Sequence, residues 1–302
     1  STITDDYETL NMYKWGLDSS YGLTGMAEGE FAVQDLTWEI VNKMNLGVEL
    51  GFLNGMIDLQ LDYFDERRKD IFMPRESVPM TAGFMKQPWK NFGKVTNQGV
   101  EVSLNVNKQF GKDLFVSLMG TFTYAHNEIT EKDEPSAVVG TNRAETGHPV
   151  GQLTGYIAEG LFTEDDFEDV STGKLKEGIP TQSFVGKLRP GDIRYRDVNG
   201  DGKVDVFDKS PIGGTKDPEI VYGFGLNMKY KNLDFGALFQ GIGRSWNILG
   251  SSIIPGANRG VTGNMFTNAN DRWTVDNPSQ NVFYPRLDDG INSNNNQPST
   301  WW

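Results

Sequence analysis

Three pairs of segments constrain the fold of this sequence more than any other feature. In each segment apolar and polar residues alternate, and a very short turn joins the two segments of a pair. In the first pair, near 45–64, apolar side chains occupy every second position on both sides of Asn54-Gly55. Asn-Gly is the strongest short signal for a hairpin, because a type I′ turn needs positive φ at both central residues. A two-residue turn places Phe52 opposite Ile57, so the apolar positions of both strands share one face. The sequence therefore predicts an amphipathic antiparallel hairpin.

The same pattern returns twice further along the chain. One pair lies near 97–126, with a turn around Gly111, and another lies near 220–241. In the last pair the predicted turn brings Phe224 opposite Phe239, which again keeps the apolar positions in phase. Three hairpins with matched phases predict an antiparallel sheet with one apolar and one polar face.

The connections between the hairpins are as informative as the turns within them. They are long, covering 65–96, 127–219 and 242–302. Structureless loops of this length are uncommon in a compact soluble domain, whereas an outer-membrane barrel has short turns on one side and long loops on the other. The predicted fold class is all-β, with antiparallel strands of a large outer-membrane β-barrel and long extracellular loops. A soluble β-sandwich with insertions is the alternative on pattern alone.

The composition excludes several classes of function. The 302 residues include no cysteine, so neither a disulfide nor a thiolate metal site is available. A net charge of −13 argues against a nucleic-acid partner, because phosphates are bound through neutralising cations. No apolar run reaches the roughly 20 residues of a transmembrane helix, but barrel strands alternate and give only a weak hydropathy signal. An aromatic content of 12% suits strands and interfacial belts.

The longest predicted loop contains a stretch with the spacing of a calcium-binding loop. Side chains with oxygen donors occupy positions 1, 3, 5, 9 and 12 of a twelve-residue run, and Gly202 occupies position 6, where such a loop turns sharply. The candidate ligands are Asp197, Asn199, Asp201, Asp205 and Asp208, with the backbone carbonyl of Lys203 at position 7. The spacing predicts one structural Ca²⁺, with Asp205 bound directly or through water.

The flanks of this stretch differ from those of an EF-hand. The residues before it are predicted to be extended, and Pro211 ends any helix that follows Asp208. Asp208 is also shorter than the bidentate Glu that usually fills position 12, so the predicted affinity is weak. An acidic turn that stays empty or holds water or sodium is the alternative. The wider loop 127–219 contains 19 Asp and Glu against 11 Lys and Arg, which is also typical of a solvated surface.

No arrangement of side chains in the sequence predicts catalysis. The two histidines, His126 and His148, have no nucleophile or metal-ligand spacing around them, and structural roles are expected. Five tryptophans lie in predicted loops or near strand ends, where they anchor a membrane interface, pack a loop or stack on a sugar. They are Trp89, Trp246, Trp273, Trp301 and Trp302.

A series of short motifs runs from about residue 36 to residue 241. One is Asn91-Phe-Gly-Lys-Val-Thr-Asn-Gln-Gly-Val-Glu101. The others are Leu36-Thr-Trp-Glu39 followed by Asn45-Leu-Gly-Val-Glu-Leu50, Asp62-Tyr-Phe-Asp-Glu-Arg-Arg-Lys-Asp-Ile71, Gly147-His-Pro-Val-Gly-Gln152, Pro190-Gly-Asp-Ile-Arg-Tyr195 and Tyr222-Gly-Phe224. In this order they resemble the SusC/RagA-type TonB-linked outer-membrane transporters, although each motif alone is weak.

The resemblance implies a much larger protein than this chain. The family combines a 22-stranded barrel with an internal plug, contacts TonB through an N-terminal box and carries a SusD-like surface lipoprotein as a lid. We find no plug sequence and no TonB-box region, and six strands cannot close such a barrel. The 302 residues are therefore expected to be a middle-to-late barrel segment. The whole protein would meet the SusD-like lipoprotein, TonB through a region absent from this chain, a glycan or peptide, and outer-membrane lipid.

The predicted function is part of an energy-coupled importer of glycans or oligopeptides in a bacterial outer membrane, without enzymatic activity. The loops 65–96 and 127–219 are placed outside the cell. The turns at Asn54-Gly55, Gly111 and Lys231-Asn232 are placed in the periplasm. The competing functions are a secreted calcium-dependent carbohydrate-binding or adhesive β-domain, and an enzyme such as a glycosidase.

The alternation also predicts which side chains contact lipid. The expected lipid-facing set is Leu46, Val48, Leu50, Leu59, Leu61, Val102, Leu104, Leu118, Phe224, Leu226 and Phe235. The polar residues expected to face the lumen or plug are Glu49, Gln60, Glu101 and Ser103.

Overall fold

The chain divides into two compact units. Unit 1 comprises Ser1–Val139, Ala144–Val150 and Glu219–Gly243, and unit 2 comprises Gly140–Arg143, Gly151–Pro218 and Arg244–Trp302. The structure is a computed structural model. It describes residues 7–11, 24–28, 33, 35–82, 86–184, 186–249, 266–287 and 293–302.

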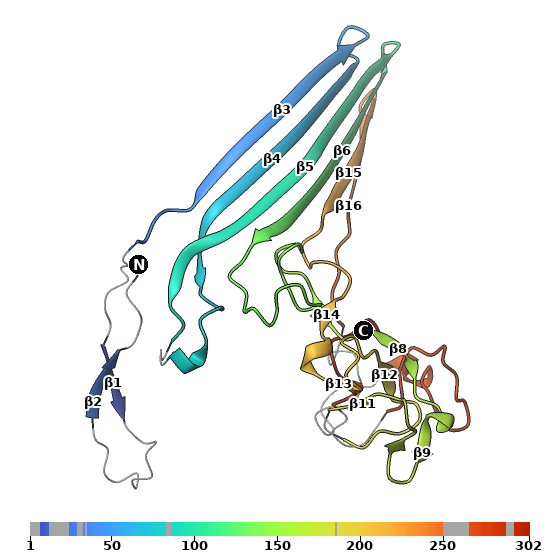
Figure 1. Ribbon diagram of the computed structural model, residues 1–302. Helices are drawn as coiled ribbons and strands as arrows, with labels where there is room; N and C mark the ends of the chain where they lie inside the picture. The colour runs from blue at the N-terminus through green and yellow to red at the C-terminus, as the bar shows by residue number, and fades with distance from the viewer. Residues whose placement is uncertain are drawn as a thin grey trace. The chain divides into compact units, whose positions relative to one another are not determined.

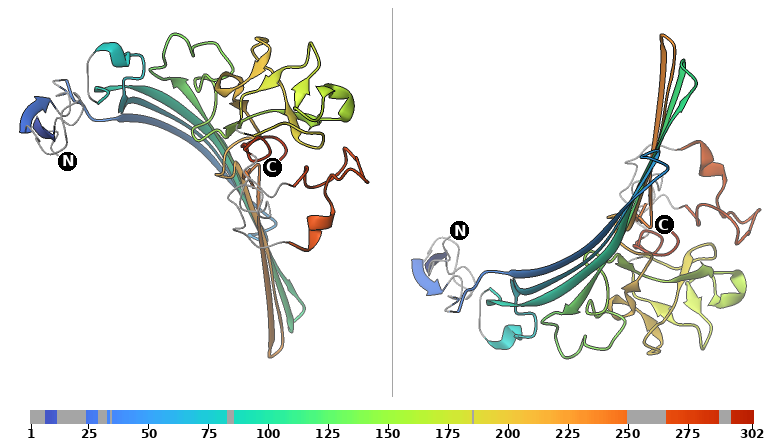
Figure 2. Two further views of the ribbon diagram at one scale, coloured as in Figure 1. Left: turned by 90° about the horizontal axis from the view of Figure 1, so that it is seen from below. Right: turned by 90° about the horizontal axis from the view of Figure 1, so that it is seen from above.

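Unit 1 is built around one six-stranded antiparallel sheet with the strand order β16-β15-β6-β5-β4-β3. Its strands are β3 (Ile40–Phe52), β4 (Ile57–Pro74), β5 (Trp89–Phe110), β6 (Leu114–Glu131), β15 (Ile220–Tyr230) and β16 (Leu233–Gly243). The long strands lie side by side in Figure 1, and Figure 2 shows the curvature of the sheet. Unit 1 also contains the hairpin of β1 (Tyr7–Asn11) and β2 (Thr24–Glu28), and the 3₁₀ turn η1 (Met80–Ala82).

The first hairpin has the predicted turn and register. Phe52 lies opposite Ile57, and the pairing continues in step along β3 and β4. Asn54 and Gly55 have φ values of 56° and 78°, as the turn requires. The prediction from Asn-Gly and the alternating pattern is therefore confirmed.

Pairing between the hairpins places the predicted apolar positions on one face. Leu59 of β4 faces both Leu50 of β3 and Leu104 of β5, and Leu226 of β15 faces Leu118 of β6. Directly paired residues share a face of the sheet. The eleven residues of the expected lipid-facing set are confirmed to lie on one face, and Glu49, Gln60, Glu101 and Ser103 lie on the other.

The strands extend into segments that were predicted to be loops. β4 continues to Pro74 and β5 begins at Trp89, so the connection predicted over 65–96 is wrong in its bounds and covers only 75–88. The charged run after Asp65 has no apolar alternation, which hid this strand from sequence analysis. Its side chains form ion pairs instead, such as Arg68 Nη1 with Glu39 Oε2 at 3.1 Å.

The described residues of unit 2 form short elements only. Its strands are β7 (Thr154–Gly155), β8 (Ala158–Leu161), β9 (Phe167–Asp169), β10 (Lys174–Leu175), β11 (Thr181–Gln182), β12 (Ile193–Tyr195), β13 (Lys203–Val204) and β14 (Ser210–Pro211), and its 3₁₀ turns are η2 (Glu164–Asp166), η3 (Val206–Asp208) and η5 (Thr267–Asn270). β7 pairs with β14, β8 with β12, and β9 with β10 in antiparallel fashion, whereas β11 and β13 are parallel. The loop predicted over 127–219 therefore begins after Glu131 and contains regular structure.

The core of unit 2 joins two parts of the chain that are far apart in sequence. Tyr156, Ile193 and Tyr195 come from the first part, and Trp273 comes from the second. The backbone links the same parts, because the Tyr156 N–H donates to the Pro298 carbonyl at 2.8 Å. The Asn- and Ser-rich final segment, which has no strand pattern, is thus held in place by segment 151–218.

Candidate functional site

The apolar face of the six-stranded sheet is exposed. Leu50 is 40% exposed, and Phe224 is 53% exposed although it lies in the middle of its strand. Phe224 stacks on Phe239 with ring centroids 4.8 Å apart. The two rings shield each other, but they leave the apolar face of the sheet exposed. A soluble sandwich would bury these side chains against a second sheet. An exposed apolar surface of this extent needs lipid or a large partner to cover it.

Over β3, β4 and β5 the opposite face is polar and acidic. Glu49, Gln60 and Ser103 form one row across three strands, and Asp62 lies directly opposite Glu101. The Gln60 Nε2 donates to Asp62 Oδ2 at 2.9 Å. Like charges directly across a sheet are unfavourable, so this face requires water or a polar occupant. The two faces together have the character of a barrel wall between lipid and an aqueous or plugged lumen.

A carboxylate clamps the 75–88 connection to the end of β6. Arg75 Nε donates to Asp133 Oδ2 at 2.7 Å, and Ser77 Oγ donates to Asp133 Oδ1 at 2.8 Å. Burial raises the pKa of Asp133, but the hydrogen bonds from Arg75 and Ser77 outweigh it and hold the pKa below its ordinary value. The clamp therefore favours the ionised carboxylate.

Carboxylates of the predicted calcium loop accept hydrogen bonds from its own backbone and so stabilise its turn. Asp197 accepts hydrogen bonds from the N–H groups of Gly200 at 2.7 Å and Gly202 at 2.8 Å. Asp201 accepts one from the Lys203 N–H at 2.9 Å. The chain reverses at Gly202, which has a φ of 83° as the predicted sharp turn requires.

Asp208 holds the other end of the loop. Its carboxylate is fully buried and accepts hydrogen bonds from the N–H groups of Val198 at 2.8 Å, Asn199 at 3.3 Å and Asp205 at 2.7 Å. Asp205 in turn accepts one from the Phe207 N–H at 2.8 Å. Among the residues that the structure describes, no three His, Cys, Asp or Glu side chains are grouped as a metal site. The predicted ligands share one loop, and Ca²⁺ binding there stays a prediction.

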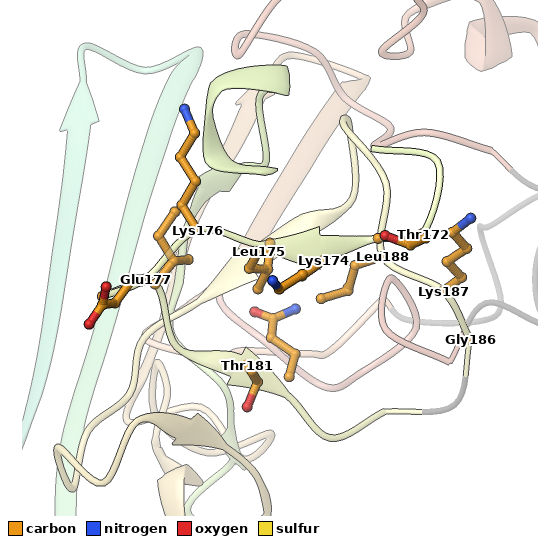
Figure 3. Close-up of a pocket in the computed structure, with 13 residues that line it drawn as sticks. Thr172, Lys174, Leu175, Lys176, Glu177, Thr181, Gly186, Lys187 and Leu188 are labelled. Carbon is orange, nitrogen blue, oxygen red and sulfur yellow. The ribbon is translucent and has the colours of Figure 1, made fainter. Parts of the chain in front are cut away.

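An open hollow of about 810 Å³ is lined by residues 172–179, 181–182 and 186–188. In Figure 3, Lys174 and Leu188 lie side by side, whereas Lys176 and Lys187 extend away from the hollow. The Lys174 ammonium is already paired, because Lys174 Nζ lies 2.5 Å from Glu168 Oε2. The hollow therefore lacks a converging set of polar groups that would select a ligand.

A buried polar network that sequence analysis missed lies beside the core of unit 2. Arg286 Nε donates to Asp192 Oδ1 at 3.0 Å, and Asn295 Nδ2 donates to the same oxygen at 2.9 Å. Burial raises the pKa of Asp192, and the Arg286 guanidinium opposes that shift. Tyr195 Oη donates to the Asn294 carbonyl at 2.7 Å. The run Asn294-Asn295-Asn296 carried only a compositional signal, which indicated a loop.

The histidines make contacts within unit 1. His126 Nδ1 lies 2.6 Å from Glu219 Oε1, which links the end of β6 to the start of β15. The backbone carbonyl of His148 accepts a hydrogen bond from the Ile129 N–H at 2.9 Å. These contacts join neighbouring segments of unit 1.

The five tryptophans separate into different environments. Trp273 is buried in the core of unit 2, and Trp301 and Trp302 pack against that core. Trp89 stacks on Phe72 with ring centroids 5.2 Å apart. Trp246 is 40% exposed in the segment that follows β16.

The wall-like sheet and the sequence of the whole chain match one protein family. The sequence model of the family described as "TonB dependent receptor-like, beta-barrel" matches residues 7–300 of this chain. The chain belongs to this family. Proteins of the TonB-dependent receptor β-barrel family reside in the outer membrane, and the exposed apolar face has the character that contact with lipid requires.

Curated relatives support the same assignment. The TonB-dependent receptor P26 of Formosa agariphila is 27% identical over 86% of this chain and 26% of its own length. The TonB-dependent receptor SusC of Bacteroides thetaiotaomicron is 29% identical over 67% of this chain and 19% of its own length. The chain thus spans about a quarter or less of the length of these relatives. The resemblance to SusC/RagA-type proteins is confirmed.

Solved structures show the same fold. A chain of the RagAB peptide transporter aligns with a TM-score of 0.63 at 21% identity, covering 96% of this chain and 29% of that chain. The RagAB peptide importer in the "open-open" state aligns with a TM-score of 0.64. The all-β antiparallel barrel class is confirmed, with a barrel that six strands do not close.

None of the helices among the described residues has the length and apolarity to cross a membrane.

Proposed function

We propose that this chain forms part of an energy-coupled outer-membrane importer that takes up glycans or oligopeptides. The two-faced sheet carries the proposal. Its apolar face suits lipid, and its polar face suits a lumen through which a polar nutrient passes. Similarity to a protein named SusC and to a chain of the RagAB peptide transporter supports an import role. The proposal assigns no enzymatic activity.

The same proposal includes partners of the whole protein. A SusD-like surface lipoprotein would close the extracellular side, and TonB would supply energy through a region absent from this chain. The loops of 75–88 and of unit 2 would lie outside the cell, and the short hairpin turns would lie in the periplasm. The contrast between a two-residue turn at Asn54-Gly55 and the large unit inserted between β6 and β15 supports this orientation.

We also propose that the Asp197–Asp208 loop holds one structural Ca²⁺. The spacing of Asp197, Asn199, Asp201, Asp205 and Asp208, with the Lys203 carbonyl, supports it. The sharp turn at Gly202 supports it as well. Carboxylate oxygens that accept backbone N–H groups keep further lone pairs for a cation. The ion would clip the loop and would not act as a switch, because paired helices do not flank it.

Uptake measurements on the producing bacterium test the importer. The gene of the full-length protein is deleted, and uptake of fluorescent oligosaccharides and oligopeptides is compared with that of a complemented strain. We expect loss of uptake for one class of nutrient. We also expect the complemented strain to lose it when the proton-motive force is collapsed. Unchanged uptake of every nutrient in the deletion strain would contradict the proposal.

A further inference from the structure

Trp246 lies flat on a pair of glycines in unit 2. A Cβ atom at Gly213 would lie 2.6 Å from Trp246 Cδ1, and a Cβ atom at Gly214 would lie 2.5 Å from Trp246 Cζ3. The first glycine is therefore under the five-membered ring and the second is under the six-membered ring. Only residues without a side chain allow an indole to approach the backbone this closely. Gly213 also has a φ of 59°, which disfavours other residues.

Hydrogen bonds hold the backbone around the glycine pair, which forms the seat of the indole ring, in place. The Leu153 N–H donates to the Gly214 carbonyl at 2.9 Å, and Gln152 Nε2 donates to the Ile212 carbonyl at 3.3 Å. The backbone N–H of Trp246 donates to the Thr215 carbonyl at 2.9 Å, which holds the backbone of Trp246 beside the residue that follows the glycines. The position of the ring is thus set by backbone contacts on the side of the glycines.

The residue Trp246 is nevertheless 40% exposed. Because its inner face covers the glycines, this exposed area belongs to its edge and outer face. Leaving the largest apolar side chain open to water gains no burial energy. The chain neighbours Ser245 and Asn247 are exposed and carry a hydroxyl and an amide. Ser245 Oγ donates to the Lys216 carbonyl at 2.7 Å, which orients the hydroxyl and leaves its lone pairs available.

We propose that Trp246 is a stacking platform for a sugar ring of the imported nutrient. A flat aromatic ring, whose neighbours in the chain carry a hydroxyl and an amide, matches a pyranose, which has an apolar C–H face and a rim of hydroxyls. A bound peptide would instead need a groove or a free strand edge for its backbone. This inference rests on the proposed import function and selects glycans as the nutrient class.

Binding to the full-length protein in detergent tests the platform. The probes are an array of glucose, xylose, mannose, galactose and galacturonate oligomers and a parallel array of oligopeptides. We expect the wild type to bind at least one oligosaccharide and Trp246→Ala to weaken that binding at least about tenfold, as truncation of an aromatic hot spot does. Trp246→Phe should keep most of the affinity. Trp38→Ala, at a tryptophan that is 91% exposed elsewhere in the chain, should leave it unchanged.

A second variant separates stacking from folding. Gly214→Val should push the indole off its seat and weaken sugar binding, while protease resistance of unit 2 reports whether the unit stays folded. Equal affinity of wild type and Trp246→Ala for every sugar bound would overturn the platform. Binding of peptides alone, or of neither array, would overturn it too. If uptake of a nutrient continues in those cases, the importer proposal stands and only the platform fails.

Discussion

Single carboxylates hold loops in place in both units, and each does so through backbone or side-chain donors. Asp133 clamps the 75–88 connection, Asp192 joins two distant segments of unit 2, and Asp208 closes the acidic loop. A buried carboxylate is stable only when such donors replace the water that it loses. Substitutions at these positions should therefore loosen local segments and leave the sheet intact.

Acidification should release the 75–88 connection. The pKa of Asp133 is lowered in the folded protein, so its stabilisation is fully present above the ordinary value of about 3.9 and is lost as the pH falls through the folded value. We expect the protection factor of the Ser77 amide, which donates to Asp133, to be high at neutral pH and to fall under strongly acidic conditions. Asp133→Asn should have low protection already at pH 7. An equal protection factor at neutral and strongly acid pH would contradict the clamp.

Calcium should protect the acidic loop from proteases. We expect Ca²⁺ to slow cleavage of the full protein between Gly191 and Ile212, with weak affinity of about 10⁻⁴–10⁻³ M. Asp197→Ala or Asp201→Ala should abolish the protection. Asp165→Ala, an exposed acidic residue outside the loop, is the matched control and should keep it. The same cleavage rate with calcium and with chelator would rule out the ion.

At the scale of elements, the long strands combine two kinds of stabilisation. Their apolar faces suit contact with lipid. The part of β4 that follows Asp65 is instead surrounded by charged contacts, which include the Arg68–Glu39 ion pair and, just beyond the strand, the Asp133 clamp. β4 has 18 residues and β5 has 22, but a tilted strand crosses the bilayer with about 9–11. These strands therefore continue well beyond the membrane, where ionic contacts replace lipid contacts.

Charge on the apolar face should be costly, and charge on the polar face should not. Leu50→Arg or Leu226→Arg should lower the free energy of unfolding by about 2–4 kcal/mol if the position lies near the bilayer midplane. Gln60→Arg is the control, because Gln60 lies beside the Leu50 row but on the polar face. Denaturant unfolding of the full-length protein in lipid vesicles measures the difference. Equal losses for Leu50→Arg and Gln60→Arg would be inconsistent with the assigned faces.

For the whole molecule, this chain supplies one sector of a barrel wall and one unit of loop structure. Its curated relatives are about four to five times longer than the aligned segment. The edges of β3 and β16 each lack a second partner in the described sheet, and backbone groups at a membrane depth must be paired. Further strands of the complete protein are therefore expected to pair with these two edges.

Labelling of intact cells tests the orientation of the barrel. The chain has no cysteine, so single cysteines can be introduced without background. We expect a membrane-impermeant thiol reagent to label Asp166→Cys in unit 2 of intact cells and to label Asn54→Cys only after the outer membrane is opened. Labelling at position 54 but not at 166 would invert the topology.

Sequence alone determined the amphipathic sheet, because the period-2 alternation and Asn54-Gly55 are local signals that fix phase and register. The motif order also determined the family. Three features depended on tertiary structure. Pairing with β3 and β5 continued β4 through a charged run, and the buried hydrogen bonds of Asn294 and Asn295 gave structure to an Asn-rich segment. The contact of Trp246 with Gly213 and Gly214 depends on the tertiary structure, because the two glycines lie 32 to 33 positions earlier in the chain. Such contacts join residues distant in sequence, and no local periodicity encodes them.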